Sequence, residues 1–174
     1  MRRRIVQVGV APSGIGSAWL RLIGESPDWT LAGVVDARAD HLDTAAERAG
    51  LAPEHCFTTI GEAAAAIEFD ACAIVVPSPL HGALCEQALE AGKHVIVEKP
   101  FTTDFAQARA LTERAERRGL RLMVDQNYRY VAEMGTLRRA VRENVAGPPA
   151  FATVSFDCLW WPGRPYQWDM ADTM

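Results

Sequence analysis

The sequence predicts a doubly wound α/β domain, in which helices cover both faces of a parallel sheet, followed by the start of a second, α+β domain. Apolar, β-branched runs alternate six times with helical patterns, and this alternation is typical of right-handed βαβ units. One run, Ala71–Val76, is continuously apolar, as expected for a parallel strand buried on both faces. The 174 residues, of which 49% are hydrophobic and 23% charged, suffice for one well-buried domain and part of another.

The strands follow from their apolar, β-branched composition and from the turn residues that bound them. We expect six strands in the first domain, at Arg4–Val10, Thr30–Asp36, Cys56–Thr58, Ala71–Val76, Lys93–Val97 and Arg121–Val124.

The helices are bounded by recognisable start and stop residues. Thr59 and Glu62 have the spacing of a capping box, Ser78 is placed as an N-cap before Pro79, and Gly92 and Gly119 follow helical runs. We expect helices at Ile15–Gly24, Asp40–Ala49, from Thr59 to Ile67, from Pro79 to Gly92, at Asp104–Arg118 and at Ala132–Glu143.

A domain boundary is expected at Gly147, which two prolines follow, so residues 1–147 would form the first domain and 148–174 the beginning of a second. Beyond the boundary, apolar and polar residues alternate over Phe151–Leu159, which predicts a strand. One strand cannot bury its own apolar face. With Trp160, Trp161 and Trp168 nearby, we expect this segment to drive self-association, so a homo-oligomer is predicted.

Composition excludes several classes of function. The net charge of −4 argues against non-specific nucleic-acid binding, which needs a basic surface. No apolar run approaches the ~18 residues of a membrane span, and the arginines at positions 2–4 precede too short an apolar stretch for a signal peptide. The four cysteines lack C-x-x-C spacing, so we expect buried thiols and no metal site. These features predict a cytoplasmic protein.

Lys99 is the strongest candidate for a catalytic residue. The apolar strand ends on Glu98, Lys99 and Pro100, and ligands of open parallel sheets bind beyond the carboxyl ends of the strands. Pro100 disfavours a helical conformation for Lys99. Lys93 and Lys99 are the only lysines among 18 basic residues, so a compact ammonium stands where the chain otherwise uses arginine. The alternative is a solvated lysine at a strand end.

A glycine-containing loop, GVAPSGIG at Gly9–Gly16, follows the first strand. It is not a P-loop, because Ile15 and Gly16 occupy the positions of the required Lys and Ser/Thr. It matches the dinucleotide fingerprint G-x-G-x-x-G imperfectly, in two alternative alignments: Gly9, Ala11 and Gly14, or Ala11, Ser13 and Gly16 with a longer turn. Glycines there let backbone amides approach a pyrophosphate at a helix N-terminus.

Asp36 strengthens the dinucleotide interpretation. It ends the second strand, 20 positions after Gly16 (36 − 16), where a ribose-binding carboxylate is expected. A carboxylate accepts ribose hydroxyls and repels a 2′-phosphate, so NAD is favoured, while nearby Arg38 leaves NADP open. The alternative is that Asp36 only begins the next turn.

One further segment, Pro77–His81, faces the same predicted edge. Pro77 and Ser78 follow the fourth strand, and His81 lies in the first turn of the next helix, where a neutral imidazole donating to a backbone or cofactor group is expected. We interpret His41, His55 and His94 as structural or solvated.

The run Glu98-Lys99-Pro100, with Pro77–His81 before it and Gln126–Tyr130 after it, closely resembles the Gfo/Idh/MocA oxidoreductases, and the resemblance spans essentially the whole chain. The resemblance implies a Rossmann NAD(P)-binding domain and oxidation or reduction of a sugar, cyclitol or related hydroxyl or carbonyl compound. It places Lys99 beside the nicotinamide, where it would polarise or hold the reacting oxygen, and Arg129 on the nicotinamide side. The expected cofactor-binding residues are Gly9, Gly14, Ile15, Gly16, Asp36, Arg38, Pro77, Ser78, His81, Glu98, Lys99 and Arg129; no metal is expected.

The chain also departs from that family's pattern. The glycine loop is about two residues longer than usual, and the family's catalytic Asp and His would lie just beyond Met174. We therefore expect this chain alone to be catalytically silent. The alternative to an enzyme is a dinucleotide-binding module, or a truncated family member, without turnover.

Overall fold

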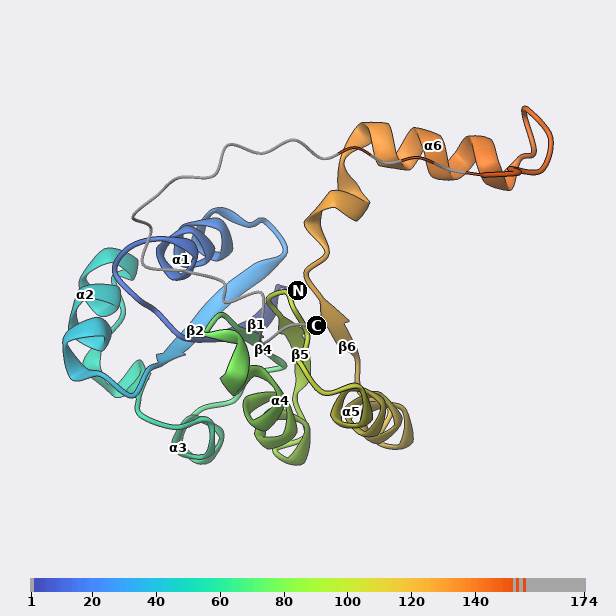
Figure 1. Ribbon diagram of the computed structural model, residues 1–174. Coiled ribbons are helices and arrows are strands. Elements are labelled where there is room, and N and C mark those ends of the chain that lie inside the picture. The colour runs from blue at the N-terminus through green and yellow to red at the C-terminus, as the bar shows by residue number, and fades with distance from the viewer. Residues whose placement is uncertain (1, 152, 154, 156–174) are drawn as a thin grey trace. The chain divides into compact units, whose positions relative to one another are not determined.

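The computed structural model describes residues 2–151, 153 and 155, in two compact units, Met1–Asp125 and Gln126–Met174. Within its described residues, the first unit carries a six-stranded parallel sheet of order β3-β2-β1-β4-β5-β6 (Figure 1). The strands are β1 (Arg3–Val8), β2 (Trp29–Val35), β3 (Cys56–Phe57), β4 (Ala71–Ile74), β5 (His94–Val97) and β6 (Leu122–Val124). The predicted doubly wound fold is confirmed.

The helices alternate with the strands as expected. They are α1 (Ile15–Glu25), α2 (Ala39–Ala49), α3 (Ile60–Ala66), α4 (His81–Glu90) and α5 (Phe105–Arg117) in the first unit and α6 (Ala132–Arg142) in the second. Most observed ends lie within two residues of the predicted ones.

The two faces of the sheet are set by the two-residue period of the strands. Val6 and Val8 of β1 pack in the cluster that contains residues of α3, α4 and α5. Ile5 packs with Ile23 of α1 in another cluster, and α2 joins α1 on that side. Alternation therefore sets the faces within β1, whereas Val10, beyond the end of the strand, packs on the α1 and α2 side.

The strand order creates the crevice in which a ligand can bind. β1 lies between β2 and β4, so the chain changes direction across the sheet between β3 and β4. Such a switch point opens a crevice at the carboxyl ends of the strands. The segments after β1, β2, β4 and β5, and Asp125 after β6, all lie at this one edge, because every pair of strands is parallel.

The helix caps confirm one expectation and correct another. Thr59 and Glu62 form the predicted capping box at the start of α3. Ser78 does not cap α4: a 3₁₀ turn over Ser78–Leu80, closed by the Leu80 N–H on the Pro77 carbonyl, takes the place of the first helical turn. The helix therefore begins at His81, and Pro79 lies in the turn before it.

Two of the cysteines are buried thiols, as predicted. Burial raises the pKa of Cys72 to about 12 and that of Cys85 to about 12. Both side chains pack in the core between the sheet and the helices α3 to α5, so they are unreactive packing residues.

The second unit is described over Gln126–Phe151 and at residues 153 and 155. It contains a 3₁₀ turn at Asn127–Tyr130 and α6. Most of the strand predicted over Phe151–Leu159, and the three tryptophans near it, fall outside the described residues. The boundary after Gly147 and the second-domain architecture stay predictions. In the described chain, no helix is both long and apolar enough to cross a membrane.

Candidate functional site

The glycine loop after β1 has two crowded glycines and one in open space. Gly9 has φ +89°, and a methyl group there would overlap the Val75 carbonyl oxygen. At Gly16 a methyl group would lie 3.0 Å from the Ala11 nitrogen, whereas Gly14, with φ +73°, has nothing near it. Gly9 thus makes the tight turn and Gly16 the close helix packing. These two are seven positions apart (16 − 9), so the loop combines the two alternative alignments and is two residues longer than G-x-G-x-x-G.

Two side chains that sequence reasoning missed hold this loop in shape. Gln7 is fully buried in β1, and its amide nitrogen donates to the carbonyls of Gly9 (2.9 Å) and Gly16 (2.8 Å). From α2, Arg48 donates to the Pro12 carbonyl (2.6 Å). The signal for Gln7 was a single amide side chain inside an apolar strand. It points to the same side of the sheet as Ile5, toward α1.

The start of α1 can receive an anion. Helix α1 has no acidic residue in its first turn, and within the described chain no side chain caps its N-terminus at Gly14. The backbone N–H groups of a first turn lack helical partners and carry a partial positive charge. Gln7 and Arg48 thus hold the carbonyls of the loop next to a helix start whose backbone N–H groups are available as donors.

Asp36 lies at the carboxyl end of β2, as predicted, and faces the α1 and α2 side of the sheet. Its Oδ2 accepts from the Val10 N–H (2.9 Å) and lies 3.2 Å from Nδ1 of His41, while its Oδ1 accepts from the Arg38 N–H (3.0 Å). The carboxylate is thereby tied to the glycine loop and to α2. Sequence reasoning took His41 as structural or solvated; the structure gives it Asp36 as a partner.

The guanidinium of Arg38 is paired with Asp40, not with Asp36. It makes a two-pronged contact with the Asp40 carboxylate, at 3.1 and 2.7 Å. The hydrogen bond from Arg38 lowers the pKa of Asp40 below its ordinary value, and the same contact raises the pKa of Arg38. Both side chains of this pair are 65% exposed, so the contact is an ordinary surface ion pair.

Glu98 and Lys99 follow β5 at the same edge. Val97 faces α3 to α5, so Glu98 turns toward α1, where its Oε1 accepts from Nε1 of Trp19 (2.8 Å). Its other oxygen accepts from the Lys99 backbone N–H (3.2 Å). The Lys99 side chain is exposed. Glu98 therefore links the helix that starts at the glycine loop to the backbone of Lys99.

A further carboxylate, Asp125, lies next to this pair. Val97 and Val124 are register partners, so Glu98 and Asp125 follow them on adjacent strands, and the Asp125 N–H donates to the Val97 carbonyl (2.8 Å). Burial raises the pKa of Asp125, the charge of Glu98 raises it further, and the charge of Lys99 opposes the shift. Sequence reasoning did not single out Asp125, because β6 carries no motif that marks it.

His81 joins two of the segments at the edge. Its side chain is 1% exposed, with Nδ1 2.7 Å from the Pro100 carbonyl oxygen and Nε2 2.8 Å from that of Val76. The ring thus contacts backbone, one of the two expected partners, and ties the segment after β4 to the one after β5. Its contact with a cofactor stays a prediction, as do those of Pro77 and Ser78.

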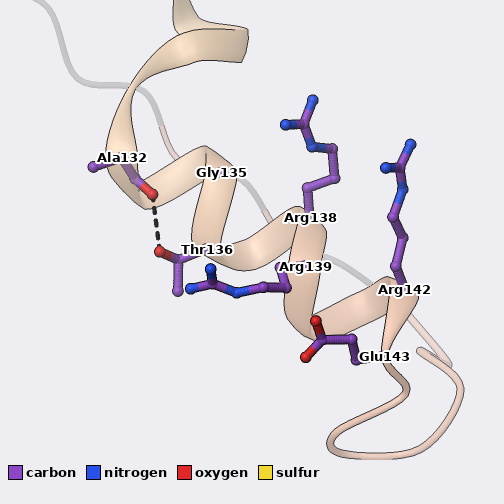
Figure 2. Close-up of a pocket in the computed structure, with 7 residues that line it drawn as sticks. All are labelled: Ala132, Gly135, Thr136, Arg138, Arg139, Arg142 and Glu143. Atoms are coloured by element: carbon purple, nitrogen blue, oxygen red, sulfur yellow. Dashed lines mark hydrogen bonds between the residues drawn. The ribbon is translucent and has the colours of Figure 1, made fainter.

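In the second unit, Arg129 lies in the 3₁₀ turn before α6. This unit also has a cavity of about 490 Å³, and its described lining comes from α6 and the residue after it: Ala132, Gly135, Thr136, Arg138, Arg139, Arg142 and Glu143 (Figure 2). Thr136 Oγ1 donates to the Ala132 carbonyl (2.9 Å). None of the predicted site residues lines this cavity. Arg139 and Arg142 lie in the last helical turn, where cations oppose the helix dipole.

The geometry of the first unit fits a dinucleotide. The glycine loop leaves space where a side chain would collide, the start of α1 offers N–H groups to a pyrophosphate, and Asp36 offers an acceptor to a ribose. Lys99 stands at the end of β5, two strands from β1, where a reacting group would be held.

Comparisons with known proteins agree with this geometry. The family model GFO_IDH_MocA, described as an oxidoreductase family with an NAD-binding Rossmann fold, matches residues 3–126. D-apiose dehydrogenase of Paraburkholderia graminis is 32% identical over 133 residues, which cover 75% of this chain and 35% of that protein.

Solved structures show the same likeness. An NAD-binding protein from Listeria innocua superposes with a TM-score of 0.70 and 29% identity, over 85% of this chain and 42% of that one. UDP-N-acetylglucosamine 3-dehydrogenase from Acidithiobacillus ferrooxidans gives 0.70 and 30%, over 80% and 43%. The chain spans less than half the length of these relatives.

Proposed function

Because the chain belongs to the Gfo/Idh/MocA oxidoreductase family, we propose that it is the NAD-binding part of an enzyme that transfers a hydride between nicotinamide and a hydroxyl-bearing carbon of a sugar or cyclitol. The observation that carries the proposal is the meeting of the glycine loop, Asp36 and Lys99 at one edge of the sheet. D-apiose and UDP-N-acetylglucosamine, named in two relatives, are both polyhydroxylated, which supports this substrate class.

Each part of the site has its own task in this proposal. When bound, the nicotinamide accepts or donates the hydride. Gly9 and Gly16 let the backbone approach the pyrophosphate, and Asp36 accepts from the adenosine ribose. Lys99 holds its ammonium beside the reacting oxygen and stabilises the negative charge that grows there as the proton leaves. Glu98 fixes the backbone of Lys99 through its N–H.

Cofactor binding tests the first half of the proposal. We expect NADH to raise the melting temperature of the purified chain more than NADPH does, because Asp36 repels a 2′-phosphate and Arg38 is held by Asp40. At about a hundredfold excess over its Kd, a ligand adds about 2.7 kcal/mol of stability. For a protein of this size that is roughly 5 to 10 °C. Equal or greater stabilisation by NADPH would contradict the assignment of Asp36.

We also propose that the protein acts in the cytoplasm as a homo-oligomer. The net charge of −4 and the ordinary globular composition support the location. Exposed apolar residues on α6, Met134, Leu137 and Val141, support association. Light scattering coupled to size exclusion should show a dimer or a larger species, and a monodisperse monomer would contradict it.

A further inference from the structure

Among the described residues, His41 supplies the one side-chain contact with the Asp36 carboxylate. The other two contacts come from backbone N–H groups of Val10 and Arg38. Both side chains of the pair are largely buried, with 19% of His41 and 13% of Asp36 exposed. The imidazole therefore meets the carboxylate where water competes weakly for the hydrogen bond.

The number of acceptor positions on Asp36 limits what it can offer a ligand. An ionised carboxylate has about four lone-pair positions. The N–H groups of Val10 and Arg38 and Nδ1 of His41 occupy three of them, two on Oδ2 and one on Oδ1. The remaining position lies on Oδ1, and it is the one available to a hydroxyl group.

The contact also sets the tautomer of the ring. A carboxylate oxygen only accepts, so His41 must carry its proton on Nδ1 to bond to Asp36. Of the charged side chains near the ring, Asp36 contacts it and Asp40 interacts with it electrostatically. The guanidinium of Arg38 is paired with Asp40. The guanidinium of Arg38 is thus not a group that fixes the Asp36 side chain, although its backbone N–H is.

We propose that His41 is a positioning residue for cofactor specificity: its Nδ1–H fixes the Asp36 carboxylate so that one acceptor position meets the adenosine ribose and its charge stands against a 2′-phosphate. The proposal rests on the proposed binding of NAD. Without the imidazole, only the two backbone N–H groups hold the carboxylate, so it turns more readily about its Cβ–Cγ bond, at the expense of those contacts. A turned carboxylate binds the ribose hydroxyl less well and repels a phosphate less.

Titration of nicotinamide fluorescence with NADH and with NADPH tests the proposal on the purified chain. His41→Ala should raise the Kd for NADH about tenfold, the typical effect of losing a hydrogen bond to a charged group. The Kd for NADPH should change much less, so that the preference for NADH shrinks. His41→Asn places an amide donor near the position of Nδ1 and should restore the preference. His41→Gln places its amide near Nε2 and should not.

Glu47→Ala, an exposed position on the same helix, is the matched control and should leave both constants unchanged. An unchanged preference in His41→Ala, or an equal loss of both cofactors together with a fall in melting temperature, would overturn the proposal. If His41→Ala does not fold, the comparison of His41→Asn with His41→Gln tests the proposal. Equal preferences for NADH over NADPH in these two variants would overturn it. A wild-type chain that binds neither cofactor contradicts the proposed function itself, and the inference falls with it.

Discussion

Replacing Lys99 with alanine should reduce kcat by about 10²- to 10³-fold while leaving the Kd for NADH nearly unchanged. That range is typical of losing one group that stabilises charge on a reacting oxygen. The exposed ammonium stands at the end of β5, and its backbone is held by Glu98. Lys99→Arg should fail almost as badly, because a planar guanidinium cannot replace a compact point charge at one oxygen. The assay uses a version of this protein with the length of its relatives, NAD⁺ as the cofactor, and a panel of sugars and cyclitols as substrates.

Lys93 provides the matched control, since it is the other lysine of the chain. Its Nζ donates to the Phe69 carbonyl (3.0 Å) and lies 4.3 Å from the centre of the Phe69 ring, so it has a packing role. Lys93→Gln should keep kcat. Trp19→Phe keeps an aromatic side chain but removes the donor to Glu98 and should lower kcat by about tenfold with the Kd for NADH unchanged. Near-normal kcat in both Lys99 variants would show that Lys99 is a solvated lysine.

Gly9→Ala should destabilise the first unit by about 3 kcal/mol or more and abolish NADH binding. The substitution combines an unfavourable φ of +89° with a methyl group that overlaps the Val75 carbonyl oxygen and lies 2.7 Å from Cγ1 of Val76. Both of those atoms lie just after β4, so the loop cannot relax without disturbing the strand next to β1. Urea unfolding, followed by circular dichroism, measures the loss.

Comparison with Gly14→Ala separates the cost of an unfavourable backbone conformation from that of a steric clash of the added methyl group. The φ of Gly14, +73°, is equally unfavourable for alanine, but nothing lies within 4 Å of the added methyl group. This variant should lose about 1 to 3 kcal/mol, the cost of a backbone conformation (φ +73°, ψ −144°) that residues other than glycine rarely adopt. If Gly9→Ala were as stable as Gly14→Ala, the close approach of the loop to β4 would be wrong.

Local patterns were enough to predict which candidate site residues lie at strand ends. Asp36 and Lys99 each follow an apolar strand, and the parallel sheet then brings them to one edge. The glycine loop was found in the same way, but the sequence did not decide between its two alignments with the fingerprint. The need for glycine at Gly9 and Gly16 comes from atoms that pack against them in the fold. Ser78 was misplaced as a cap because a 3₁₀ turn and a helical first turn have the same composition.

Side chains that join distant segments could not be predicted. Trp19 and Glu98 are 79 positions apart, and Arg48 reaches Pro12 across 36. Asp125 and Glu98 become neighbours only when β5 and β6 pair. His41 is close to Asp36 in sequence, yet its contact depends on the direction in which α2 leaves β2. In each case the partner is chosen by tertiary packing, which one-dimensional spacing does not encode.

A crystal structure of the chain with NADH tests the central claim most directly. We expect the pyrophosphate at the start of α1, a ribose hydroxyl within hydrogen-bonding distance of Oδ1 of Asp36, and the nicotinamide beside Lys99. The contacts of His41 and Val10 with Oδ2 should be kept. Dinucleotide bound elsewhere, or an adenosine ribose that does not touch Asp36, would contradict the account.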